Sequence, residues 1–178
     1  MRLTLVPHPD TPCAAVRGIA VEVRRAGTQL DLGFRVEGDF EQIVLPERHG
    51  DLARADELWK HTCFEAFVAA GQGYGEINLS PSGRWASYGF DGYRSGMAVR
   101  AGFDLTFADE DRSETAYDLI AELDLTDLPA TGVWSVGLSA VIELIDGRRC
   151  YWALHHAPGK PDFHHPDAFV LSLPVETP

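Results

Sequence analysis

The chain has few of the residues that would tie it to an oxidising compartment or to nucleic acid. Cysteine occurs only three times in 178 residues and never in a C-x-x-C pair, so neither a disulfide framework nor a zinc site of that type is expected. We interpret the cysteines as reduced core residues. Lysine and arginine (15) are outnumbered by aspartate and glutamate (27), and the net charge is -12. Because phosphate backbones repel such a chain, nucleic acid is not an expected partner.

Long apolar runs and an export signal are also lacking. No stretch approaches the roughly 20 apolar residues of a membrane span, and the apolar part of MRLTLVPHPD at the start is too short for a signal peptide. We therefore expect no membrane partner and a cytoplasmic location. With 45% hydrophobic and 24% charged residues, the composition is that of a globular protein, and we expect residues 1–178 to form a single domain. The oligomeric state is left open.

Helical periodicity is scarce, and strand-type alternation takes its place. Apolar residues occupy every second position in four segments, 30–36, 99–107, 117–125 and 134–144. The Asp146-Gly147 pair between two apolar runs is typical of a two-residue hairpin. We predict an all-β fold, a β-sandwich of two antiparallel sheets with about ten or more strands.

Rings and hydrogen-bonding side chains are concentrated between residues 58 and 96. If residues 59–68 and 76–80 are strands, Glu65 and Asn78 belong to a polar row on one sheet surface, next to Trp59 and Trp85. Aromatic faces stack on the C–H faces of a sugar or on a planar ligand, while carboxylates, amides and guanidinium groups bind hydroxyls directionally. The sequence therefore predicts a cleft for a carbohydrate or another small ligand.

The predicted cleft residues fall into three groups by chemistry. The candidates for stacking are Trp59, Trp85 and Tyr93. The candidates for recognising hydroxyls or carboxylates are Lys60, Glu65, Asn78, Arg84 and Arg94. At the rim we place His61 and His164. Trp59 and Trp85 also fit packing in a β-sandwich core, which is the role we assign to Trp134.

Two sets of residues also fit a catalytic or metal-binding role. Glu65 and Glu76 on successive strands would oppose each other like the carboxyl pair of a glycosidase. A sheet face that hydrogen-bonds its own polar residues has the same pattern, so we favour binding over catalysis. The segment HHAPGKPDFHHPDAF (155–169) holds enough histidine and aspartate for a metal site. Its prolines and glycine favour a rigid loop whose side chains cap their own backbone.

Several collinear motifs from Leu58 onward carry a family resemblance: LWKHTCFEAFV, YGEINLSPSGRWASYGFDGYRSGM, WSVGLSAVIE, YWALHHAPGKPDFHHPDAF and LSL. They resemble the DOMON-like group, which is related to the family-nine carbohydrate-binding modules. The resemblance implies an immunoglobulin-like or jelly-roll-like β-sandwich. Its relatives bind sugars between aromatic side chains, or bind haem in redox domains.

The resemblance extends to particular positions. Trp59 matches an aromatic or acidic residue that precedes the strand, and Glu65 matches the acidic residue on that strand. The stretch from Asn78 to Gly83 matches an asparagine-turn-glycine step, and 163–166 resembles the closing FH-x-P segment. Sugar-binding relatives are usually secreted and attached to an enzyme. For this chain we therefore expect a soluble sugar, a nucleotide sugar or another metabolite ahead of a polysaccharide.

Haem is the main alternative that the resemblance implies. Haem-binding relatives use a methionine and a histidine as axial ligands, and the matching candidates are Met97 with His155, His156 or His164. Our first expectation is a non-catalytic domain that binds a sugar without a cofactor. The alternatives are a haem or metal redox domain, a metal-dependent enzyme built on the histidine-rich loop, and a sandwich that binds a protein partner.

Overall fold

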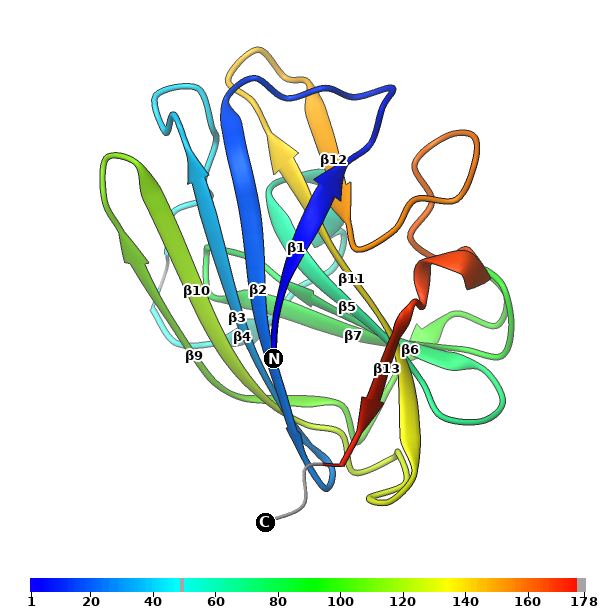
Figure 1. Ribbon diagram of the computed structural model, residues 1–178. Helices are drawn as coiled ribbons and strands as arrows, with labels where there is room; N and C mark the ends of the chain where they lie inside the picture. Colours follow the sequence, from blue (N-terminus) through cyan, green and yellow to red (C-terminus); the bar gives the residue numbers. More distant parts are fainter. Residues whose placement is uncertain (49, 176–178) are drawn as a thin grey trace.

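The computed structural model describes residues 1–48 and 50–175, and the described chain is almost entirely strand (Figure 1). Its helical parts are two three-residue 3-10 turns, η1 (Leu58–Lys60) and η2 (Pro166–Ala168). The strands are β1 (Arg2–Pro7), β2 (Val16–Ala26), β3 (Gln29–Gly38), β4 (Ala53–Arg54), β5 (Cys63–Ala69), β6 (Tyr74–Leu79), β7 (Arg84–Phe90), β8 (Ala98–Val99), β9 (Asp104–Arg112), β10 (Ala116–Asp124), β11 (Val133–Glu143), β12 (Arg149–Ala153) and β13 (Leu171–Pro174). No helix in the described part of the chain is long and apolar enough to cross a membrane.

The strands form one continuous, strongly curled sheet. Its order is β4-β7-β6-β5-β11-β12-β1-β2-β3-β10-β9, with β13 beside β11 and β8 beside β7. The link is β1, because Arg2–Leu5 pair with β2 whereas Val6 and Pro7 pair with β12. We call β4-β7-β6-β5-β11-β12 the β5 half and β2-β3-β10-β9 the β3 half.

The all-β prediction with ten or more strands is confirmed. The strands do not form two separate antiparallel sheets, because β1 hydrogen-bonds to both halves and β4 pairs with β7 in parallel. The hairpin predicted at Asp146-Gly147 joins β11 to β12, and Gly147 has a φ of 83°. That positive φ is the conformation that a glycine adopts without steric cost.

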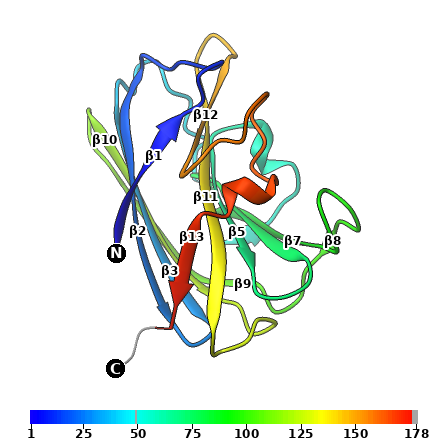
Figure 2. The same ribbon diagram turned by 45° about the vertical axis from the view of Figure 1, so that its right-hand side comes forward.

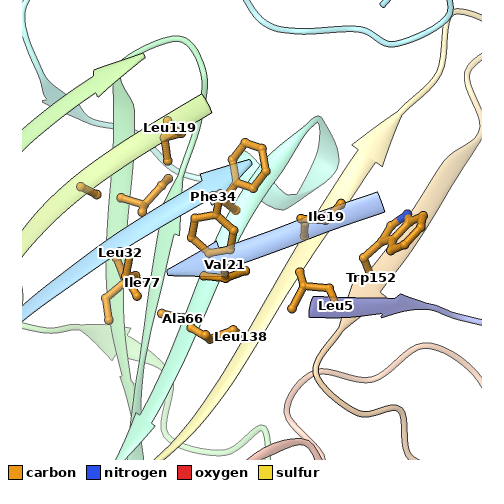
Figure 3. Packing of buried hydrophobic residues seen from close by; sticks show 14 of the residues in the cluster. Leu5, Ile19, Val21, Leu32, Phe34, Ala66, Ile77, Leu119, Leu138 and Trp152 are labelled. Atoms are coloured by element: carbon orange, nitrogen blue, oxygen red, sulfur yellow. The ribbon is translucent and has the colours of Figure 1, made fainter. Parts of the chain in front are cut away.

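The main core lies between the inner faces of the two halves. Val21 and Phe34 from the β3 half pack in the same buried cluster as Ala66, Ile77 and Leu138 from the β5 half (Figure 3). Each comes from a strand whose alternate side chains face inward, as period-two alternation requires. Trp134, which we predicted to be a core residue, is fully buried in this cluster.

The β5 half is covered on its outer face as well. The outward side chains Phe67, Tyr74, Tyr88 and Phe90 form a second buried cluster with Phe163 of the connection between β12 and β13. This connection runs over the sheet as the orange and red segment in Figure 2. We call residues 154–170 the closing loop. The β5 half therefore has two buried faces, an inner face in the main core and an outer face beneath the closing loop.

Candidate ligand-binding pocket

A pocket of about 510 Å³ opens on the outer face of the β5 half. Its floor comes from β5, β6, β7, β11 and β12, and its walls come from η1, the loop that follows β7 and the closing loop. The lining residues are Trp59, Glu65, Glu76, Phe90, Arg94, Met97, Val141, Arg149, Tyr151, Lys160, Pro161, Phe163 and His164. The volume falls in the range of small-ligand sites.

Two carboxyl groups lie at the floor of this pocket. Glu65 on β5 and Glu76 on β6 both point to the outer face, as the alternation predicts, but they are only 2% and 4% exposed. Ser139 donates a hydrogen bond to Glu65 Oε2 at 3.3 Å, and Asn78 Nδ2 donates to Glu76 Oε1 at 2.7 Å. The polar row is thus correct in position, but it is buried under the closing loop and does not form an open surface.

The surroundings of the two carboxyl groups favour their protonated forms. Burial raises the pKa of Glu65 well above its usual range, and the neighbouring Glu76 raises it further. Burial also raises the pKa of Glu76, against the opposing effects of the Asn78 hydrogen bond and the Arg94 charge. The pair therefore brings less negative charge to the pocket than two ionised glutamates would.

His164 lies next to this pair. Its Nδ1 is 2.8 Å from the Tyr74 hydroxyl, and its Nε2 is 3.7 Å from Glu76 Oε2. Burial lowers the pKa of His164 to about 4, and the charge of Arg94 lowers it further. The imidazole is therefore neutral at pH 7, and its contact with Glu76 is not an ion pair under that condition.

Asp162 joins the two loops that border the pocket. Its carboxylate accepts hydrogen bonds from Arg94 Nη2 at 2.8 Å and from the Tyr93 hydroxyl. Arg94 adopts a left-handed backbone conformation with a φ of 50°, and its N–H donates to the Tyr74 hydroxyl. Burial would raise the pKa of Asp162, but the hydrogen bonds from Tyr93 and Arg94 outweigh it and hold the pKa below the ordinary value. The charged form of Asp162 thus links the closing loop to the β7–β8 loop through its bonds to Tyr93 and Arg94.

Aromatic side chains contribute to opposite sides of the pocket. Trp59 comes from η1 and is half-buried, with its ring edge-on to Tyr88 at 5.8 Å between centroids. Tyr151 of β12 and Phe163 of the closing loop are 5.9 Å apart between centroids. Both rings line the same space as the carboxyl groups. The pocket therefore combines apolar ring surfaces with directional hydrogen-bonding groups.

The structure brings part of the predicted site together. The predicted residues that line the pocket are Trp59, Glu65, Arg94 and His164. Asn78 and Tyr93 do not line it. Asn78 is fully buried and donates a hydrogen bond to Glu76. Tyr93 is 55% exposed and donates a hydrogen bond to Asp162. Their contribution is to position pocket residues.

Trp85 requires a correction. It lies opposite Leu79 on the inner face of the sheet, is 7% exposed and belongs to the main core. The Arg54 guanidinium lies over its ring at 3.9 Å from the centroid. The predicted stacking role does not fit a ring on the side of the sheet away from the pocket.

Three further predicted residues lie outside the pocket lining. Lys60 forms an ion pair with Glu57 at 2.7 Å, and His61 lies 2.7 Å from Glu143. Arg84 begins β7 opposite Ala53 of β4.

The histidine-rich loop does not gather its histidines at one point. His156 Nε2 lies 2.9 Å from the Val6 carbonyl oxygen, and neither His155 nor His156 lines the pocket. Across residues 1–48 and 50–175, histidine, cysteine, aspartate and glutamate form no group of three or more that could hold a metal ion. Met97 and His164 both line the pocket.

Sequence reasoning missed several lining residues. Among them are Phe90, Arg149, Tyr151 and Lys160, which lie on β7, on β12 and in the closing loop. The alternation of β12 does contain a signal for Tyr151, because Cys150 and Trp152 face the main core and Tyr151 must face the other way. No local pattern indicates that Lys160 faces the pocket.

Comparisons with known proteins identify the fold. A protein from Bacteroides uniformis ATCC 8492, named as a candidate carbohydrate-binding protein, superimposes with a TM-score of 0.71 at 15% identity over 99% of this chain and 86% of that chain. A family-9 carbohydrate-binding module from Caldicellulosiruptor kristjanssonii matches at 9% identity and a TM-score of 0.55, both in complex with glucose (89% of this chain, 76% of that chain) and in complex with cellotriose (94% and 83%). No family model and no curated protein matches the chain. At these identities the likeness establishes a shared fold.

Proposed function

We propose that the pocket on the outer face of the β5 half binds a carbohydrate and does not catalyse a reaction on it. The observation that carries the proposal is the lining itself, which sets Trp59 and Tyr151 beside the floor carboxyl groups Glu65 and Glu76. Rings offer stacking surfaces to the C–H faces of a sugar, and the polar groups offer directional hydrogen bonds to hydroxyls. The fold shared with sugar-bound family-9 modules supports the same assignment.

The carboxyl pair supports binding over catalysis. A glycosidase keeps one of its two carboxyl groups ionised, to act as nucleophile or base, while the other is the acid. Here burial raises the pKa of both Glu65 and Glu76. Burial thus favours the neutral form of each, in which a carboxyl group both donates and accepts hydrogen bonds with sugar hydroxyls and is a poor nucleophile. We therefore propose a non-catalytic domain, and we expect it to bind its ligand without a cofactor.

Three further proposals concern the fold group, the location and the kind of ligand. We propose a DOMON-like domain whose curled sheet functions as a two-layer sandwich, with the ligand site on one outer face rather than between the layers. We further propose a cytoplasmic location and a soluble ligand, such as a free or nucleotide-linked sugar. Each of these is separable from the binding proposal itself.

The binding proposal is tested on a glycan array with two variants. Trp59→Ala removes a ring that lines the pocket, and Phe107→Ala removes a ring of β9 that is 45% exposed and lies outside the pocket. A stacked ring adds about 1 kcal/mol beyond its buried area, so Trp59→Ala is expected to weaken the strongest array signal about fivefold in affinity. Phe107→Ala should leave it unchanged. If the unaltered protein binds no glycan, the proposal fails.

A haem-binding redox domain is the second candidate, because Met97 and His164 line the same pocket. The surroundings of His164 do not fit this role well. Its Nδ1 is engaged by the Tyr74 hydroxyl, and the Nε2 left to bind iron has the Glu76 carboxyl 3.7 Å away. We expect haem titration to give no Soret band that depends on Met97. A band that disappears in Met97→Ala and persists in His155→Ala would favour haem over sugar.

A further inference from the structure

The charges around the pocket differ in sign from those of the chain as a whole. The chain carries a net charge of -12, but three basic side chains, Arg94, Arg149 and Lys160, line the pocket. The acidic lining residues are Glu65 and Glu76, both nearly fully buried at the floor. Burial favours the protonated form of these two groups, and basic side chains outnumber acidic ones in the pocket lining.

Two of the three basic groups have no acidic partner. Arg94 is neutralised by Asp162 at 2.8 Å. Arg149 donates a hydrogen bond at 3.3 Å to the backbone carbonyl of Lys60, and within the described part of the chain it forms no ion pair. Lys160 likewise has neither a hydrogen bond nor an ion pair to a described residue. Arg149 and Lys160 are thus exposed side chains that line the pocket without an ion-pair partner among the described residues.

Two neighbouring basic residues do have acidic partners. Arg148, adjacent to Arg149 in the sequence, bonds to Asp146 at 2.8 Å, and Lys60 bonds to Glu57 at 2.7 Å. Acidic residues are therefore within reach of other basic groups at this end of the sheet. Glu143 lies opposite Arg149 in the register of β11 and β12, but its carboxylate contacts His61 at 2.7 Å.

We propose that the natural ligand of the pocket is an acidic sugar, whose carboxylate or phosphate group is bound by Lys160 and Arg149 while its ring lies against the aromatic lining. This inference rests on the proposed carbohydrate function and specifies its ligand class. A guanidinium group binds carboxylate and phosphate oxygens in a bidentate manner, and an ammonium group adds a point charge. Both side chains are exposed, so salt should screen their attraction for an anion.

The experiment compares three ligands by calorimetric titration: D-glucose, D-glucuronic acid and D-glucose 6-phosphate. We expect at least one acidic sugar to bind about tenfold or more tightly than glucose, and the ratio to shrink when salt is raised from about 0.05 to 0.5 M. Preference for glucuronic acid identifies a carboxylate ligand, and preference for the phosphate identifies a sugar phosphate. Either result supports the proposal.

Variants separate the pocket cations from general charge. Lys160→Gln and Arg149→Gln should each reduce the acidic-to-neutral affinity ratio about fivefold, with glucose and the acidic sugar both measured on the same variant. The matched control is Arg148→Gln, which removes the same charge one residue away from Arg149 and outside the pocket lining. An equal loss in Arg148→Gln would mean that overall charge sets the ratio, and would overturn the proposal.

The outcomes also separate this inference from the proposed function. If glucose or other neutral glycans on the array bind as tightly as the acidic sugars, the acidic-ligand inference is wrong and the carbohydrate function stands. If no glycan of either kind binds the unaltered protein, the carbohydrate function itself is wrong, and the inference is lost with it.

Discussion

The two faces of the β5 half are both buried, but they are built from different chemistry. The inner face presents Ile77, Leu79 and Trp85, which pack against the β3 half in an apolar core. The outer face presents Glu65 of β5 and Glu76 of β6, which directly precedes Ile77, beneath a loop that leaves a pocket of about 510 Å³ open. A strand alternates its side chains between faces, so one short sequence supplies a folding core on one side and a site on the other.

The largest expected effect distinguishes the two faces through their tryptophans. Trp85→Ala removes a core ring that is 7% exposed, and we expect the free energy of unfolding to fall by about 3–5 kcal/mol. Trp59→Ala truncates a half-buried pocket ring and should change it by about 1 kcal/mol or less. Urea denaturation of both variants measures the difference. Equal losses from the two changes would mean that the outer face is a second core rather than a site.

The clamp between the two bordering loops is expected to give an intermediate effect. Asp162→Asn removes the charge that pairs with Arg94 and an acceptor for the Tyr93 hydroxyl. We expect sugar affinity to fall about tenfold, because the β7–β8 loop is no longer fastened across the pocket, while the free energy of unfolding changes by about 1 kcal/mol. Titration with the best array ligand measures the affinity.

The control for the clamp is Asp146→Asn. Asp146 pairs with Arg148 in an exposed hairpin outside the pocket lining, so its loss should not alter sugar affinity. If Asp162→Asn binds as tightly as the unaltered protein, the loops do not need this link and the two-loop description of the site is incorrect.

The smallest expected effect is a pH dependence at the pocket floor. Because the pKa of Glu65 is raised in the folded state, the folded protein holds this proton more strongly than the unfolded chain, and stability is lost as the pH rises through the folded pKa. Glu65→Gln removes this loss. The variant should therefore have a higher midpoint of thermal unfolding at pH 8 by a few degrees, with a smaller gap at pH 4.5.

An exposed glutamate provides the reference for this pH test. Glu122→Gln changes a surface position of β10 and should show the same midpoint difference at both pH values. The prediction concerns the difference in unfolding midpoint between Glu65→Gln and the unaltered protein. If this difference is absent at pH 8, or is larger at pH 4.5, the folded state does not raise the pKa of the floor carboxyl.

Period-two alternation predicted much of the fold and the correct face for the floor residues. It assigned Glu65 and Asn78 to one sheet surface, and the structure places them there, opposite the core face that holds Ile77 and Leu79. It did not predict that this face is buried, because alternation cannot tell whether a segment distant in the sequence covers an outward face. Here the closing loop, about 90 residues away in the sequence, covers it, as the Tyr74–His164 contact shows.

The remaining errors have similar physical origins. Trp85 was given a surface role because it follows a turn next to charged residues, but its pairing with Leu79 places it on the inner face. The short turn at 80–83 would have indicated this register. Arg149 lies two residues from Tyr151 on β12, so alternation would have placed it on the same outer face. Lys160 could not have been predicted, because its approach to the pocket depends on the path of the closing loop. Such placements arise from tertiary structure, not from local pattern.

The most direct test of the two-face account is an amide chemical-shift titration of ¹⁵N-labelled protein with the sugar that gives the strongest array signal. We predict that the shifts concentrate at the pocket, at Trp59, Arg94, Lys160 and His164 and at the outward residues of β5 and β6. Shifts centred on the exposed face of the β3 half, for example around Ile120, would contradict the account, because they would place the ligand on the opposite side of the molecule.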